Sequence, residues 1–314
     1  MSESHHRPAH ESVRIPEPSC VLELVMDDGA IIHVRRHGNP AGPRVMLSHG
    51  NGLAIDAYFP FWSLMLPHYD VIVFDFRNHG ANPMHGGARH DLEHFVSDLE
   101  RVWQHTQREF GPKPVAGLFH SLSALAAIRH ALEYPDRWRA LVLFDPPIYP
   151  REGHPLRESQ QTDKDSLAER ARRRIERYPS PHEFARQLAS RPAFKRWRPE
   201  AYELMARATL RRDQSGGDWV LACPRELEAR VFSENRDPSL WVKLGEVKVP
   251  VKLIGADPHL ESAGPPARIA KAIAEEIPIE YESIPDTTHF LQLEKPEQCL
   301  RAVESFLAKH GMAP

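Results

Sequence analysis

The chain has 314 residues, of which 41% are hydrophobic and 26% charged, and its formal net charge is −3. The length allows one large domain, or one domain that carries an insertion, and the composition is ordinary for a globular protein. A charge this close to zero excludes a strong basic field, so we expect neither nucleic-acid binding nor attachment to an anionic membrane.

The cysteines indicate a reducing compartment. Cys20, Cys223 and Cys299 are odd in number and lack the spacing of metal ligands, so we expect free thiols and a cytoplasmic protein. No apolar run is long enough to cross a membrane, and the start of the chain lacks the apolar core of a signal peptide. We expect residues 1–18 to be a disordered tail, and we predict neither a metal site nor a cofactor.

The sequence of the first third of the chain predicts strands followed by glycine-rich or polar loops. Residues 20–26 and 31–35 are β-type runs around Asp27-Asp28-Gly29, which predicts a hairpin. A third strand at 43–48 leads directly into His49-Gly50-Asn51-Gly52, where two glycines permit close approach of a ligand to the backbone.

Buried strands and amphipathic helices then alternate. Residues 54–67 are predicted to form an aromatic-rich helix, and 69–76 a strand of the kind found inside parallel sheets. A long helix is expected over 92–110, with apolar residues on one side and charges on the other. Residues 139–144 form another buried strand, which Asp145 closes.

The stretch 115–128 predicts a buried strand, a tight turn and the first turns of a helix. Such a turn suits a nucleophilic serine, because it pushes the hydroxyl out of the sheet and places backbone N–H groups beside it. Compared with the pattern G-x-S-x-G, the sequence reads Phe119-His120-Ser121-Leu122-Ser123, in which Phe119 is not small. Ser123 is the alternative nucleophile, but bulky Leu125 stands two residues after it, so Ser121 is favoured.

From 148 to 247 the character of the sequence changes. Charged helical stretches are broken by prolines, and no convincing strand is present, which predicts a helical insertion. Large aromatic residues recur in it, and we expect some of them to cover the serine and contact the substrate; the candidates are Trp197, Trp219 and Trp241.

The alternation of strands and helices resumes after the insertion. Strands are predicted at 249–255 and 279–284, followed by loops that contain Asp257 and His289. Alternating elements favour a mostly parallel sheet covered on both faces. Ser121, Asp257 and His289 then follow the carboxyl ends of strands, where open α/β sheets place their sites.

These motifs together resemble the α/β-hydrolase fold superfamily, in particular its capped, serine esterase- or lipase-like members. The matching segments are the elbow, H-G-N-G at 49–52, D-F-R-N-H-G at 75–80, G-A-D-P at 255–258 and T-T-H-F-L-Q-L-E-K-P-E at 287–297. Asn78 stands where that family usually has glycine. The resemblance implies an α/β fold with a mostly parallel eight-stranded sheet, helices on both faces and a helical cap. The core would be 19–147 and 248–314, and the cap 148–247.

The resemblance also implies roles for single residues. Ser121 would be the nucleophile, His289 the base and Asp257 the acid that orients it. The N–H groups of Asn51 and Leu122 would form the oxyanion hole.

Other residues could take the roles of the acid and the base. Asp145 ends a strand as Asp257 does and could supply the acid instead. His79 and His120 match positions that usually serve structure, and His49 is expected to brace the oxyanion loop through its ring N–H.

The sequence therefore predicts a cofactor-free serine carboxylesterase that cleaves esters with apolar acyl or aryl groups through an acyl-enzyme. A C–C bond hydrolase or a thioesterase would use the same triad, and a non-catalytic ligand-binding protein is the alternative from another class. The expected partner is a small-molecule ester, and the chain is expected to be a monomer or a homodimer.

Overall fold

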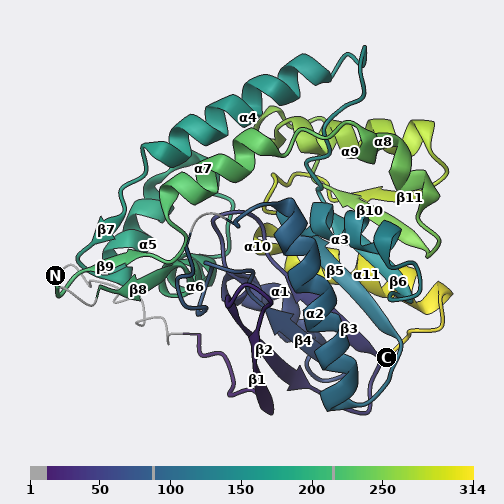
Figure 1. The fold of residues 1–314 in the computed structure, drawn as a ribbon. Helices are drawn as coiled ribbons and strands as arrows, with labels where there is room; N and C mark the ends of the chain where they lie inside the picture. The colour runs from purple at the N-terminus through teal and green to yellow at the C-terminus, as the bar shows by residue number, and fades with distance from the viewer. Residues whose placement is uncertain (1–12, 87–88, 214–215) are drawn as a thin grey trace, which may run out of the picture.

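The computed structural model describes residues 13–86, 89–213 and 216–314, and an eight-stranded sheet forms its centre (Figure 1). Most of the tail predicted to be disordered, residues 1–12, lies outside the described residues. The strand order is β1-β2-β4-β3-β5-β6-β10-β11, which confirms the predicted sheet. The strands are β1 (Cys20–Val25), β2 (Ile31–Gly38), β3 (Arg44–Ser48), β4 (Asp70–Phe74), β5 (Val115–His120), β6 (Ala140–Phe144), β10 (Val251–Gly255) and β11 (Glu280–Ser283).

The sheet is mostly parallel, as expected. The strands from β4 to β11 in this order pair in parallel, whereas β2 pairs antiparallel with both β1 and β4. The predicted hairpin joins β1 to β2, and Gly29 takes a φ of 88° in its turn. Every residue of β3, β4, β5, β6 and β10 is buried, which explains why their sequences are nearly continuous apolar runs.

Helices cover both faces of the sheet (Figure 1). In β3, Met46 packs into the cluster under α2 and α3, while Val45 and Leu47 pack into the cluster under α1 and α11. The predicted aromatic helix is a short α1 between two 3₁₀ turns, at Ile55–Tyr58 and Ser63–Met65. The helices of the core are α1 (Phe59–Trp62), α2 (Leu92–Phe110), α3 (Leu122–Glu133), α9 (Pro265–Glu276), α10 (Leu291–Glu294) and α11 (Pro296–Lys309).

The insertion is mainly helical but also contains a small antiparallel sheet. The prediction of no strand there is wrong, because three runs of two or three residues pair in the order β7-β9-β8. Runs this short carry no period-two pattern that a sequence reading could detect. The elements are α4 (Arg157–Arg172), β7 (Arg177–Tyr178), α5 (Pro181–Ser190), α6 (Pro199–Thr209), β8 (Leu210–Arg212), β9 (Trp219–Leu221), α7 (Arg225–Glu234) and α8 (Ser239–Lys243).

The insertion packs on the carboxyl edge of the sheet. Helices α4 and α7 lie side by side above it, and α6 contacts the 3₁₀ turn at Ile55–Tyr58 (Figure 1). Leu204 and Met205 of α6 belong to the same apolar cluster as Val45 and Leu47, so the insertion shares the core of the main domain. Among the helices of the described residues, none has the length and apolar character needed to span a bilayer.

His37 in β2 is a buried histidine whose contribution to stability depends on pH. It is 3% exposed, its ring lies 5.1 Å from that of Trp62, and neither ring nitrogen has a partner among the described residues. Burial lowers the pKa of His37 to about 4. In the unfolded chain the pKa of His37 is about 6.5. Between pH 6.5 and 4 the unfolded chain is therefore protonated at His37 while the folded chain is not, so the free energy of unfolding decreases as the pH falls.

We therefore expect His37→Leu to flatten the dependence of stability on pH. The slope of the unfolding free energy between pH 6.5 and 5 should decrease by at most about 1.4 kcal/mol per pH unit. Urea unfolding of both proteins at several pH values measures this slope. An equal slope in the variant would show that folding does not lower the pKa of His37.

Candidate active site

Ser121 lies at the predicted turn between β5 and α3, in a backbone conformation of φ 54° and ψ −115°. A non-glycine residue rarely adopts this conformation, so the surrounding structure must hold it. The Ser121 N–H donates to the Phe144 carbonyl at 3.0 Å, and the N–H groups of Ala124 and Leu125 donate to the Ser121 carbonyl. The predicted strand, turn and helix are confirmed, and the turn is tied to the neighbouring strand β6.

The alternative nucleophile, Ser123, is engaged with the backbone. Its hydroxyl accepts from the His120 N–H and donates to the His120 carbonyl, both at 2.8 Å, and the side chain is fully buried. Ser123 therefore braces the elbow from behind, whereas the Ser121 hydroxyl faces a histidine.

Phe119 does not crowd the serine. Its ring is buried in the apolar cluster under α2 and α3, in T-shaped contact with Trp138 at 5.4 Å. A Cβ placed on Gly117 would lie 2.4 Å from Phe119 Cε2 and 2.7 Å from Leu141 Cδ2. Gly117, two residues earlier on the same face of the strand, thus leaves the room that the large side chain fills.

Ser121, His289 and Asp145 form a continuous hydrogen-bonded series. His289 Nε2 lies 3.0 Å from Ser121 Oγ, and His289 Nδ1 lies 2.6 Å from Asp145 Oδ2. Asp145 is fully buried at the end of β6, and its other oxygen accepts from the Ala256 N–H at 3.1 Å. With Nδ1–H donated to the carboxylate, Nε2 is the nitrogen that can accept the serine proton.

Asp257 is not part of this series, so its prediction as the acid is wrong. Its carboxylate accepts from the N–H groups of Asp286 at 2.8 Å and His259 at 2.9 Å, and these bonds lower its pKa. Asp257 and Asp145 follow adjacent strands, β10 and β6, and therefore reach the same edge of the sheet. Since β6 is the strand next to β5, the carboxylate of Asp145 lies one strand closer to the serine.

The backbone of the loop at 49–52 leaves one N–H available beside the serine. The Gly50 N–H donates to the Tyr58 hydroxyl at 3.3 Å, and the Gly52 N–H donates to His79 Nε2 at 3.1 Å. Within the described residues, the N–H groups of Asn51 and Leu122 have no acceptor. These two donors are free for a ligand, and their role as an oxyanion hole stays a prediction.

Two buried histidines hold the loops on either side of the serine. His49 Nδ1 donates to the Gly50 carbonyl at 2.8 Å, which confirms that this ring N–H braces the loop. His120 accepts from the Tyr58 hydroxyl at 2.7 Å and donates to the His289 carbonyl at 2.8 Å. Burial lowers the pKa of both histidines, that of His49 to about 4, so both are neutral supports at neutral pH.

A third buried histidine belongs to a potential ligand cluster behind the loop. Ligand atoms of His79, His90 and Cys223 lie within 4.8 Å of one another. However, His79 Nδ1 donates to the Arg77 carbonyl at 3.0 Å, and its Nε2 accepts from Gly52. Ligation by His79 would break one of these bonds, so the cluster is better described as packing that fixes the loop.

A cavity of about 380 Å³ opens above Ser121 and His289. Apolar side chains from the loops and the insertion form much of its wall, namely Leu53, Leu167, Ala171, Phe184, Leu188, Phe194, Trp197, Met205, Phe232 and Phe290. Trp197 lines the cavity, and its contact with substrate stays a prediction, whereas Trp219 and Trp241 are not among the lining residues. Trp219 packs under Arg212, and Trp241 is buried elsewhere with its Nε1 donating to Glu276 at 2.8 Å.

Charged residues that sequence analysis missed also line this cavity. Glu228 of α7 pairs with Arg174, and its carbonyl accepts from the Asn51 side chain at 2.8 Å. A Cβ on Gly52, which has a φ of 70°, would lie 2.5 Å from Glu228 Cδ, so only glycine lets this carboxylate approach the loop. No motif signals such a contact, because it joins residues 177 positions apart.

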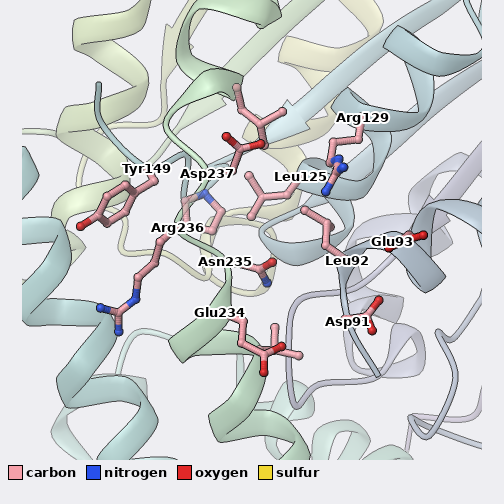
Figure 2. A pocket seen from close by; sticks show the side chains of 13 residues that line it. Asp91, Leu92, Glu93, Leu125, Arg129, Tyr149, Glu234, Asn235, Arg236 and Asp237 are labelled. Atoms are coloured by element: carbon pink, nitrogen blue, oxygen red, sulfur yellow. The ribbon is translucent and has the colours of Figure 1, made fainter. Parts of the chain in front are cut away.

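A second cavity of about 220 Å³ lies between the start of α2, the middle of α3 and the segment after α7 (Figure 2). Its wall contains Asp91, Glu93, Arg129, Glu234 and Asp237, as Figure 2 shows. Neither Ser121 nor His289 lines it, so it is separate from the cavity above the serine.

Known proteins resemble this chain in sequence pattern and in fold. A model of the alpha/beta hydrolase family matches residues 45–302. The structure of an E-2-(acetamidomethylene)succinate hydrolase superimposes with a TM-score of 0.74 at 19% identity, over 92% of this chain and 100% of that one. A carboxylesterase of the thaumarchaeon Nitrososphaera gargenis gives 0.69 at 16% identity, and a malate-bound esterase of Thermogutta terrifontis gives 0.67 at 22%; each comparison covers 93% of this chain and 99% of the other.

We expect Gly117→Ala to destabilise the chain by about 1–3 kcal/mol, because the added methyl group overlaps the Phe119 ring. In a Phe119→Leu background the same substitution should cost clearly less, since the ring atom at 2.4 Å is gone and the overlap with Leu141 Cδ2 at 2.7 Å remains. Chemical denaturation of the four proteins measures this coupling. Equal costs in both backgrounds would contradict the packing described for the elbow.

We expect Asp145→Asn to lower kcat about 10⁴-fold with the fold intact, because the amide no longer fixes the His289 tautomer. Asp257→Asn is the matched control, and it should retain most of kcat while lowering stability. Steady-state hydrolysis of p-nitrophenyl butyrate and thermal unfolding distinguish the two effects. The opposite ranking of kcat values would move the acid to Asp257.

Proposed function

The chain belongs to the alpha/beta hydrolase family, and we propose that it is a serine hydrolase that cleaves carboxylic esters through an acyl-enzyme. The observation that carries this proposal is the series Ser121–His289–Asp145, with contacts of 3.0 and 2.6 Å, at the floor of a largely apolar cavity. A protein that only bound a ligand would need neither the strained serine nor its alignment with a histidine and a buried carboxylate.

In the first half of the reaction, Ser121 Oγ attacks the ester carbonyl while His289 Nε2 takes the hydroxyl proton. The buried carboxylate of Asp145 stabilises the imidazolium that forms. The carbonyl oxygen becomes negatively charged, and we assign its stabilisation to the N–H groups of Asn51 and Leu122. Each such donor contributes roughly 3 kcal/mol to the transition state.

Collapse of this intermediate breaks the ester C–O bond, and His289 returns the proton to the departing alcohol. Water then attacks the acyl-enzyme, with His289 again acting as the base, and the carboxylic acid leaves. The chain supplies every group that these steps require, so the mechanism involves no cofactor.

The apolar wall supports an ester with an apolar acyl or aryl part next to the carbonyl. Burying one additional methylene contributes about 0.8 kcal/mol, so a cavity of about 380 Å³ favours short or medium groups. Trp197, Phe194 and Phe290 form an aromatic group in that wall, with ring separations of 4.6 Å between Phe194 and Trp197 and 5.0 Å between Trp197 and Phe290. The free cysteines support a cytoplasmic location.

Replacement of each elbow serine tests the proposal. Ser121→Ala should abolish hydrolysis of p-nitrophenyl butyrate, because the nucleophile is lost. Ser123→Ala should retain hydrolysis and lose stability, since it removes two hydrogen bonds to the backbone. Circular dichroism establishes that both variants are folded. Undiminished turnover by folded Ser121→Ala would refute the assignment.

A further inference from the structure

Positive charge dominates the ionised side chains around the cavity above Ser121. Arg170, Arg174 and Arg191 line it from the insertion, whereas Glu228 is the single carboxylate among its described lining residues. An apolar ester alone would have no use for this arrangement, because desolvating a guanidinium against an apolar group is unfavourable.

The three arginines are not equivalent. Arg174 is largely buried and is neutralised by its ion pair with Glu228. Because Arg174 neutralises it, the Glu228 carboxylate does not repel an oxyanion bound at the N–H groups of Asn51 and Leu122. The Arg174–Glu228 pair is therefore neutral as a whole, and it does not attract an anionic ligand.

Arg170 and Arg191 are exposed at the opening of the same cavity. Among the described residues, neither has a carboxylate within salt-bridge distance. Asp163 interacts with Arg170 at longer range, but it is not part of the cavity wall. The N–H donors of these two guanidinium groups are therefore not bound by any carboxylate of the described residues.

The donors on these two side chains suit a carboxylate. A guanidinium presents several N–H groups in one plane, and two of them can bind both oxygens of a carboxylate at once. Trp197, which is 4% exposed, adds apolar ring surface to the cavity wall.

We propose that the preferred substrate is an ester that also carries an ionised carboxylate, held by Arg170 and Arg191 while the ester carbonyl lies at Ser121. The apolar wall accommodates the hydrocarbon part between the two groups. This inference rests on the proposed esterase function and specifies its substrate class. The positive opening also attracts an anion from solution, an effect that salt weakens.

The second cavity provides a contrast within the same molecule. Asp91, Glu93, Glu234 and Asp237 outnumber Arg129 and Arg236 in its wall (Figure 2). The excess of arginine in the cavity that contains the serine is therefore absent from this second cavity.

Two pairs of esters test the proposal, each with a carboxylate in one member and a neutral isopropyl group of similar shape in the other. p-Nitrophenyl hydrogen glutarate and p-nitrophenyl 5-methylhexanoate vary the acyl part; 4-acetoxybenzoate and 4-isopropylphenyl acetate vary the alcohol part. The ratio of kcat/KM within a pair is compared between proteins, so that differences in intrinsic reactivity cancel.

In the Arg170→Gln/Arg191→Gln protein, this ratio should fall about fivefold or more for at least one pair, as expected for two solvent-accessible ion pairs. Arg173→Gln is the matched control. It removes a neighbouring positive charge that is 78% exposed and pairs with Glu169, and its ratio should equal that of the wild type. Unchanged ratios in the double variant, or an equal fall in Arg173→Gln, would overturn the proposal.

A binding measurement separates this proposal from the esterase assignment. Calorimetry with the Ser121→Ala protein should detect monomethyl glutarate, and the affinity should fall severalfold when Arg170 and Arg191 are also replaced. If no ester is turned over but this difference is seen, the esterase function fails and the anion site stands. If esters are turned over but monomethyl glutarate binding does not depend on the arginines, the anion site fails.

Discussion

The strained backbone at Ser121 is the constraint on which the rest of the site depends. Its φ of 54° is maintained by hydrogen bonds to β6 and α3 and by the Ser123 hydroxyl behind it. In the strand that leads to this turn, Gly117 leaves room for the Phe119 ring. The turn exposes one serine hydroxyl to His289, and it leaves the N–H of Leu122 unpaired within the described structure.

Neutral hydrogen bonds connect the loops around this serine. From Gly50 they run through the Tyr58 hydroxyl and His120 to the carbonyl of His289, so the loop that offers the Asn51 N–H and the loop that offers the base are fixed relative to each other. Burial lowers the pKa of His120, which keeps this support uncharged beside a base that must become charged.

Sequence patterns predicted the fold and the order of the catalytic candidates, because buried strands, amphipathic helices and turns are local signals. They failed where the outcome depended on spatial neighbours. Asp145 and Asp257 both end strands, and only the adjacency of β6 to β5 decides between them. Similarly, the recurrence of aromatic residues in the insertion could not show that Trp197 lines the cavity while Trp241 contacts Glu276. The Glu228–Arg174 pair and the short strands of the insertion carry no sequence signature.

In the proposed reaction, Ser121 becomes acylated during turnover. Rapid acid quenching during hydrolysis of a p-nitrophenyl ester, followed by mass spectrometry of the intact chain and its peptides, tests this most directly. One acyl group per chain is expected, attached to the peptide at Ser121 and absent when Ser121 is replaced by alanine. An adduct on Ser123, or undiminished turnover by folded Ser121→Ala, would contradict it.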